Sequence, residues 1–392
     1  MSSGVEHSGP VQRQPAPANR RAPGLARPCP NRPAPLRGWR RLFPLLTVLL
    51  SLLATAVVGE IVLRLAGYSP AHVNPLRAFH TYDPAIGWRG RKLYAARFKR
   101  PDFDVFIAHN ADGFRQQVNL APKLNRAPHR LFVFGDSFVW GWGVGQGEVF
   151  TDRLNLRLPD YAVENYGVDG VGTVVEDRLF ATEVKPLVRP GDVVLLMFCN
   201  NDFGDNVDRK KLHAEAVNGE VKIVNPAKRL TTPLEDWLKN QSYFVNFVCY
   251  RADLYRLTRG SRKQADEVLG PTIAKSDERY VVTKDFLARF AAECAAAKAR
   301  FIVAHIPSQE ELAEGQVARP NKLANEKARG DTLFAITRAL QIETVDLLPG
   351  FLARKQKTGE TLTFPHDGHW NTTGHQAVAE LLSEYLSTHP TK

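Results

Sequence analysis

From Arg130 onward, short apolar runs alternate with longer amphipathic stretches. The apolar runs predict strands at residues 131–134, 162–166, 192–199, 301–306 and 342–347. Apolar positions spaced three and four residues apart predict helices at 148–158, 173–187, 280–299, 323–340 and 373–387. Strands and helices that alternate in this way form a parallel sheet covered on both faces. The pattern therefore predicts an α/β fold, a three-layer α/β/α sandwich around a mostly parallel sheet.

Two segments depart from this alternation. Residues 203–279 are polar at first and then contain an aromatic helical stretch at 237–257. We expect them to form an insertion near the carboxyl ends of the strands, where α/β ligand sites lie. Residues 66–128 contain turn residues and short alternations that predict hairpins or an edge strand. They are expected to form an N-terminal extension or cap on a main domain at 129–392.

A long apolar segment precedes these regions. Residues 42–58, which follow Arg40 and Arg41, carry no charge, and the run can be extended to residue 65. A membrane-spanning helix needs about 20 mostly apolar residues. The segment 42–65 is thus predicted to be a transmembrane signal-anchor. A cleaved signal peptide, with a small-residue site at Ala54-Thr55-Ala56, is the alternative.

The net charge of +11 would suggest a nucleic-acid partner if it were spread over the fold. Residues 1–41, however, hold eight arginines against one acid, Glu6, which leaves only +4 for the remaining 351 residues. We therefore expect no nucleic-acid binding. The Pro- and Arg-rich tail 1–41 is predicted to be disordered and to stay in the cytoplasm. The rest would lie outside the cytoplasm, on a single-pass inner-membrane protein or, after signal cleavage, as a secreted protein.

The four cysteines are Cys29, Cys199, Cys249 and Cys294. Their wide spacing does not resemble a disulfide framework or a zinc motif. Small buried apolar residues are the simpler interpretation. One disulfide, for instance Cys249–Cys294, remains open in an oxidising compartment.

The first candidate motif is Gly135-Asp136-Ser137-Phe138, directly after the first predicted strand. A serine at such a strand end can present its hydroxyl to a substrate and its N–H to a developing oxyanion. The position also suits a helix N-cap.

Two further motifs end the next two strands. The run 165–173 holds Gly167, Gly170 and Gly172, which let a backbone N–H approach a ligand closely, or simply form a tight turn. The third strand ends in Cys199-Asn200-Asn201-Asp202, where the asparagine amide can donate to an oxyanion or cap a turn.

The fourth motif, residues 365–375, brings carboxylate and imidazole groups into one loop before the last helix. A histidine base needs a partner on Nδ1 that fixes its tautomer. A metal cluster of His366, Asp367, His369 and His375 is the alternative.

The order of these motifs, and their place at strand ends, resembles the SGNH hydrolases, the GDSL-like esterases, and in particular their bacterial membrane-anchored members. The resemblance implies an SGNH, flavodoxin-like sheet. It implies Ser137 as nucleophile and His369 as general base. The N–H groups of Ser137 and Gly170 and the amide of Asn201 would form the oxyanion hole, and no metal or organic cofactor would be required.

The chain departs from the family pattern at three positions. Phe138 replaces a leucine, and Cys199 stands where a glycine is usual. The usual acid lies three residues before the histidine, but that residue here is His366, and Asp367 lies two before. The resemblance to exported polysaccharide acyl-modifying relatives implies Asp367 as the orienting acid.

The implied activity is hydrolysis of an ester, such as an O-acyl or O-acetyl group on an envelope glycan or lipid. An O-acyltransferase with the same triad and an inactive binding scaffold are the alternatives. The acceptor site would lie in the cap and the insertion, whose sequences do not identify it.

Overall fold

The computed structural model describes residues 39–68, 79–225, 237–239, 241–260, 273–313 and 320–390. The chain divides into two units, residues 1–54 and 55–392, and each is described by itself. Most of the predicted disordered tail, residues 1–38, lies outside the described residues.

The centre of the second unit is a parallel sheet of five strands. They are β5 (His129–Gly135), β6 (Tyr161–Gly167), β7 (Val193–Phe198), β10 (Arg300–His305) and β11 (Glu343–Asp346). Their order across the sheet is β11-β10-β7-β5-β6, and every neighbouring pair is parallel. The chain thus starts in β5, turns to β6 and then winds the other way, which is the flavodoxin-like order. Its switch point lies between β5 and β7.

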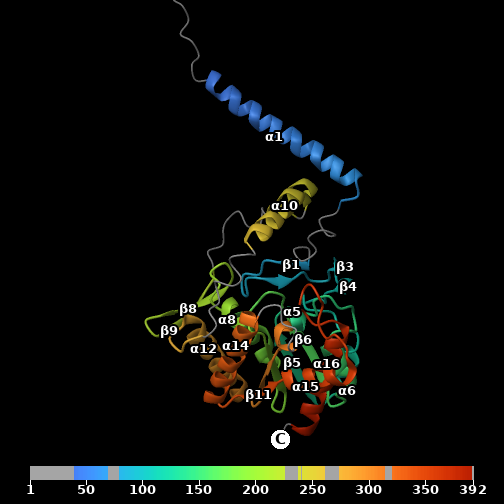
Figure 1. Cartoon of the computed structure of the whole chain (residues 1–392), viewed down its shortest axis with the longest axis vertical. Helices are drawn as coiled ribbons and strands as arrows, with labels where there is room; N and C mark the ends of the chain where they lie inside the picture. The colour runs from blue at the N-terminus through green and yellow to red at the C-terminus, as the bar shows by residue number, and fades with distance from the viewer. Residues whose placement is uncertain are drawn as a thin grey trace, which may run out of the picture. The chain divides into compact units, whose positions relative to one another are not determined.

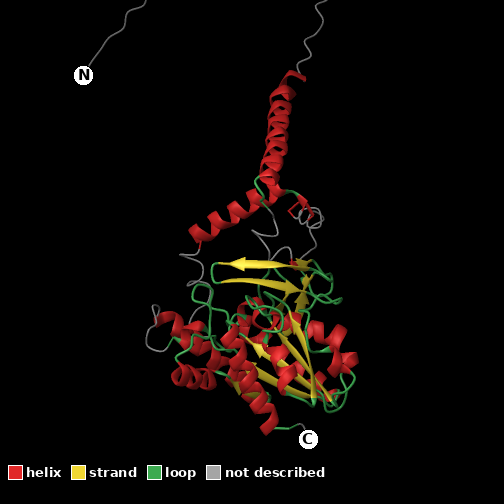
Figure 2. Ribbon diagram, turned by 90° about the vertical axis from the view of Figure 1, so that its right-hand side faces the viewer, coloured by secondary structure: helices red, strands yellow, loops and turns green. Residues whose placement is uncertain are grey.

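Helices cover both faces of the sheet (Figure 2). Successive strand residues point to opposite faces, so the apolar strands present side chains that must be buried on each face. On one face, Leu131 and Val133 pack with α6 (Phe150–Arg157), α15 (Leu348–Thr358) and α16 (Thr372–Thr388). On the other, Phe132 and Phe134 pack with α7 (Thr173–Leu179), α12 (Glu278–Ala296) and α14 (Pro320–Ala339). The predicted three-layer α/β/α sandwich is confirmed.

The predicted helix at 173–187 is not one regular helix. α7 continues into a π-helical turn at Phe180–Val184 and a 3₁₀ turn at Lys185–Leu187. Pro186 lies in that last turn, and a proline lacks the N–H that a helix interior needs. Helix α15 and the short α13 (Gln309–Leu312) had not been predicted at all.

The N-terminal extension forms two antiparallel strand pairs, as predicted. Short strands β1 (His80–Thr81) and β2 (Arg89–Gly90) pair, and β3 (Ala95–Arg100) forms a hairpin with β4 (Phe103–Ala108). A one-turn helix, α4 (Ala121–Leu124), then leads to β5. Phe98, Phe103 and Ile107 of the hairpin belong to the same core as Leu131, so the hairpin packs on the domain that contains the central sheet.

The insertion begins with α8 (Asp202–Asp205) and continues with the hairpin of β8 (His213–Val217) and β9 (Glu220–Val224). Helix α10 (Tyr243–Gly260) then forms in the predicted aromatic stretch. Cys199, Cys249 and Cys294 are free thiols, so the Cys249–Cys294 disulfide is not formed.

The apolar segment is one helix, α1 (Trp39–Leu65), drawn in blue in Figure 1. Its part Leu42–Leu65, in which 18 consecutive residues reach a mean hydropathy of 2.3, is long and apolar enough to cross a membrane, although a signal sequence would have the same properties. Near its end, Glu60 accepts hydrogen bonds from Ser242 Oγ at 3.0 Å and Phe244 N at 2.9 Å. The only acid of the segment is thus satisfied by the start of α10.

Candidate active site

Ser137 is the first residue of the short helix α5 (Ser137–Trp140), two residues after the end of β5. A side chain on Gly135 would meet Val139 Cγ2 at 2.3 Å, so the sharp turn requires glycine. The N-cap of α5 is Asp136, whose carboxylate accepts from Phe138 N at 3.0 Å. The alternative role of Ser137 as N-cap is therefore wrong. Its Oγ lies instead 2.7 Å from His369 Nε2.

The other ring nitrogen of His369 is held by Asp367. Asp367 Oδ1 bonds to His369 Nδ1 and also accepts from the backbone N of His369 at 3.2 Å. Its Oδ2 accepts from the indole Nε1 of Trp142 at 2.7 Å. Burial raises the pKa of Asp367, but the hydrogen bonds from His369 and Trp142 outweigh it and hold the pKa below the usual value. The carboxylate is thus ionised at neutral pH and keeps a proton on Nδ1, which leaves Nε2 free to face the serine.

One polar network links two residues of the predicted oxyanion hole, Gly170 and Asn201. Asn201, between β7 and α8, donates from Nδ2 to Asp205 Oδ2 at 3.0 Å and to Asp136 Oδ2 at 3.3 Å. Lys211 donates to Asp205 Oδ1 at 2.7 Å and to the carbonyl of Gly170 at 3.0 Å. Gly170 has a left-handed φ of +69°, a conformation that glycine adopts freely. The network therefore joins Gly170 and Asn201 to the residue that precedes Ser137.

Buried carboxyl groups lie around this network. Burial, and then the charge of Asp136, raise the pKa of Asp169 to about 7, although the charge of His369 opposes this. Burial likewise raises the pKa of Asp136, and the pKa values of Glu176 and Asp202 lie well above their usual range for the same reason. A pKa of about 7 leaves Asp169 about half protonated at neutral pH, which limits the negative charge beside His369.

The four residues of the alternative metal cluster do not converge. His366 Nδ1 pairs with Asp102 of the N-terminal hairpin, while Asp367 pairs with His369. His375 lies in the core, where burial lowers its pKa to about 3 and its Nδ1 accepts from Phe150 N at 3.3 Å. Within the described ranges, no group of three His, Cys, Asp or Glu side chains is arranged to hold a metal ion.

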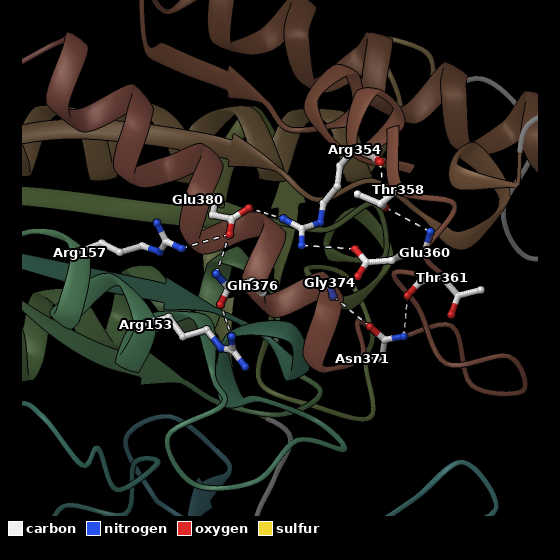
Figure 3. A network of polar contacts seen from close by, with 10 residues as sticks. All are labelled: Arg153, Arg157, Arg354, Thr358, Glu360, Thr361, Asn371, Gly374, Gln376 and Glu380. Atoms are coloured by element: carbon white, nitrogen blue, oxygen red, sulfur yellow. Dashed lines mark hydrogen bonds and ion pairs between the residues drawn. The ribbon is translucent and has the colours of Figure 1, made fainter. Parts of the chain in front are cut away.

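The loop that carries Asp367 and His369 ends at helix α16, which is held by the polar contacts drawn in Figure 3. Asn371 caps α16 by accepting from Gly374 N at 2.9 Å, and its amide donates to Thr361 O at 2.8 Å. Further along α16, Glu380 pairs with Arg157 of α6 and Arg354 of α15. The histidine thus precedes a helix that is fixed to two neighbours.

Two residues at the site were missed in the sequence. Trp142 follows the nucleophile in a glycine-rich turn. The available signal was a tryptophan close to the nucleophile, because a buried indole N–H usually needs a hydrogen-bond acceptor. Asp102 had none, because an acid between two short strands is an ordinary turn residue.

Several solved structures are similar to this chain, all at low identity. One is a lipolytic protein of the G-D-S-L family from Veillonella parvula DSM 2008, at 14% identity, covering 66% of this chain and 98% of that one, with a TM-score of 0.38. Another is LAE5, an alpha/beta hydrolase enzyme from the metagenome of Lake Arreo, at 16% identity, with coverages of 66% and 95% and a TM-score of 0.39. A third is Axe2, an acetylxylan esterase from Geobacillus stearothermophilus, at 12% identity, with coverages of 66% and 94% and a TM-score of 0.38.

A comparison with curated protein sequences found no match. The family model of the GDSL-like lipases and acylhydrolases matches residues 133–377, more than half of the chain, and this segment begins within β5 and ends within α16. It contains all five residues of the candidate triad and oxyanion hole. The chain therefore belongs to the GDSL-like lipase/acylhydrolase family, as an SGNH-type esterase.

Proposed function

We propose that the chain is a serine hydrolase that cleaves an ester through Ser137, His369 and Asp367. The observation that carries the proposal is the 2.7 Å contact between Ser137 Oγ and His369 Nε2, with Asp367 on the opposite ring nitrogen. This is the geometry in which an imidazole removes the proton of an attacking hydroxyl.

The reaction has two steps. Ser137 Oγ bonds to the ester carbonyl carbon as its proton passes to His369 Nε2, and the carbonyl oxygen becomes an oxyanion. Collapse of this intermediate breaks the bond to the alcohol, which takes the proton from His369, and leaves an acyl-serine. Water then attacks the acyl-serine in the same way, releases the acid and restores Ser137.

The oxyanion would be stabilised by the N–H groups of Ser137 and Gly170 and the amide of Asn201. Asp136 and Asp205 hold that amide in place before substrate binds. The contact to Asp136, at 3.3 Å, is the longer of the two. It is therefore the one that we expect the oxyanion to replace.

The experiment that tests this function is Ser137→Ala in the full-length protein, assayed with p-nitrophenyl acetate. Loss of the nucleophile should lower kcat by roughly 10³-fold or more. The melting temperature should change little, because the hydroxyl bonds to His369 and caps no helix. Asn201→Ala, which removes one proposed oxyanion donor but keeps the nucleophile, should lower kcat by a smaller factor, on the order of 10²–10³.

Wild-type protein should also form a covalent adduct with a fluorophosphonate. Wild-type protein that forms no adduct and cleaves no short-chain ester would indicate the inactive scaffold instead. Acyl transfer to an added glycan in preference to water would indicate the acyltransferase.

We propose further that the enzyme acts outside the cytoplasm, on O-acyl groups of an envelope glycan or lipid. The support is the apolar helix Leu42–Leu65 behind a tail with eight arginines, since positive flanks stay in the cytoplasm. Alkaline phosphatase fused after Lys392 should be active. An inactive phosphatase fusion, together with an active fusion of a cytoplasmic reporter at the same position, would contradict this orientation. The mass of the mature protein tells an anchored chain from one cleaved near Ala56.

A further inference from the structure

Trp142 contacts all three residues of the proposed triad. Its backbone N–H donates to Ser137 O at 3.0 Å. Its indole Nε1 donates to Asp367 Oδ2 at 2.7 Å. Its ring stacks on the imidazole of His369, with centroids 5.0 Å apart and planes 19° from parallel.

These contacts give each carboxylate oxygen of Asp367 its own hydrogen-bond donor. One oxygen faces His369, and the other faces Trp142. A carboxylate held on one oxygen alone can rotate about its bond to Cβ, whereas donors on both oxygens fix its plane. The stacked indole restricts the imidazole in turn, so the acid and the base of the proposed triad are both oriented by a single side chain.

Trp142 is itself seated by the β3–β4 hairpin. Phe98 and Phe103 meet the indole edge-on, with ring centroids 4.9 and 6.4 Å away. Phe103 also contacts Phe364, at the start of the loop that carries the acid and the base. The hairpin therefore packs against Trp142 and the catalytic loop together.

The turn of the hairpin holds the same loop by polar contacts. Asp102 accepts from the backbone N of His366 at 3.0 Å and pairs with its Nδ1. The carboxylate of Asp102 is 4% exposed, whereas the side chain of His366 is 76% exposed. Asp102 thus fixes the residue directly before Asp367 from a position 264 residues earlier in the chain.

We propose that Trp142 and Asp102 are positioning residues of the esterase: Trp142 orients Asp367 and His369, and Asp102 fixes the loop that carries them. The inference rests on the proposed triad and adds to it that the N-terminal hairpin is part of the catalytic unit. Neither residue exchanges a proton with the substrate.

The decisive variant is Trp142→Phe. It replaces the indole by a smaller aromatic ring that can still stack on His369 but has no N–H donor for Asp367. We expect kcat to fall by roughly 10–100-fold with little change in KM, as for a misplaced catalytic group. The lost donor also leaves more of the negative charge of Asp367 to face the imidazolium that forms when the base takes up a proton. The acidic limb of kcat/KM should therefore move to higher pH, a change that a packing defect does not produce.

Trp140→Phe is the matched control. Trp140 lies two residues earlier, is 1% exposed, and donates its indole N–H to His109 Nε2 at 2.9 Å rather than to the triad. The substitution should lower the melting temperature but leave the pH profile as in the wild type.

Asp102 gives a second, independent measurement. Asp102→Ala frees the loop and should lower kcat by about tenfold. Asp102→Asn should restore most of the activity, because its oxygen can accept from His366 N and its amide can donate to a neutral His366 Nδ1. This pair of variants decides the matter if Trp142→Phe does not fold.

The inference is overturned if folded Trp142→Phe has the kcat and the pH profile of the wild type, or if Trp140→Phe shifts the profile equally. It is also overturned if Asp102→Ala is as active as wild type. Failure of the proposed function is a different result, in which wild-type protein neither cleaves p-nitrophenyl acetate nor reacts with a fluorophosphonate.

Discussion

At the scale of single residues, the shortened spacing between acid and base is the least usual feature of the site. Asp367 and His369 are separated only by Gly368, which has a φ of +86°. This left-handed turn, which glycine adopts without strain, lets Asp367 accept from both the backbone N and the ring of His369. His366, at the usual acid position, pairs with Asp102 instead. The role of Asp367 remains a prediction from the resemblance, and its geometry supports it.

The first prediction concerns Asp367→Asn. An asparagine has one oxygen and one N–H₂ group, but both His369 and Trp142 present N–H donors to this side chain. An amide that satisfies Trp142 faces the imidazole with its N–H₂ and favours the wrong tautomer. We expect kcat to fall strongly, by up to about 10⁴-fold as in the serine-protease triad, with an unchanged circular dichroism spectrum.

The control for that variant is His366→Ala. Its backbone N–H still reaches Asp102, so the loop keeps one of its two contacts. Activity should remain within a small factor of wild type in steady-state assays. A larger loss of activity in His366→Ala than in Asp367→Asn would show that the orienting role does not belong to Asp367.

At the scale of elements, the central strands were predictable because a strand covered on both faces is mostly apolar. Residues 131–134 of β5 and all of β7 are continuous apolar runs whose residues alternate between the two cores. Helix α15 was missed because its first turn contains Pro349 and Gly350, which interrupt the helical pattern. A side chain on Gly350 would meet Leu381 of α16 at 2.4 Å, so this glycine serves close packing between helices. Only the tertiary structure reveals that requirement.

A second prediction concerns Asn371, which caps α16 and ties it to residue 361 (Figure 3). Asn371→Ala removes the cap and should lower the free energy of unfolding by about 0.5–2 kcal/mol. Because His369 lies two residues before the cap, kcat should fall as well. Urea unfolding and ester turnover, measured on the same preparation, check both effects.

Asn371→Asp separates the two contacts, since a carboxylate can still accept from Gly374 N but cannot donate to Thr361 O. It should retain most of the stability. Wild-type stability in Asn371→Ala would show that neighbouring contacts of Glu380 alone fix the start of α16.

At the scale of the whole molecule, the sequence predicted which strand ends lie together at the candidate site but not what surrounds them. The order of parallel strands follows from general rules of winding, so Ser137, Gly170 and Asn201 could be expected at one edge of the sheet. The contact between Asp102 and His366 could not, because it joins a turn to a loop without any periodic pattern between them. The raised pKa values of the buried carboxyl groups could not be predicted either, because they depend on burial by segments that are distant in the sequence.

One of those acids gives the last prediction. Asp177 on α7 is 1% exposed, and Arg289 lies 3.4 Å from it with its own side chain 42% exposed. Burial raises the pKa of Asp177 to about 7, although the charge of Arg289 opposes the shift. In the unfolded chain an aspartate titrates near ~3.9. Between these two values the native state binds more protons, so the carboxyl makes stability fall as pH rises from about 4 to about 7.

Asp177→Asn has the same size and cannot ionise, so it removes that dependence. The free energy of unfolding of the variant, minus that of the wild type, should increase across this window by on the order of 2–4 kcal/mol and then stay level above it. Urea unfolding at pH 4.5, 6 and 8 measures the difference, with Asp331→Asn at an exposed position of α14 as the matched control. A difference that does not change with pH would mean that Asp177 is ionised in the native state throughout, held by Arg289. In that case the pair, rather than a neutral acid, would be what α7 and α12 bury between them.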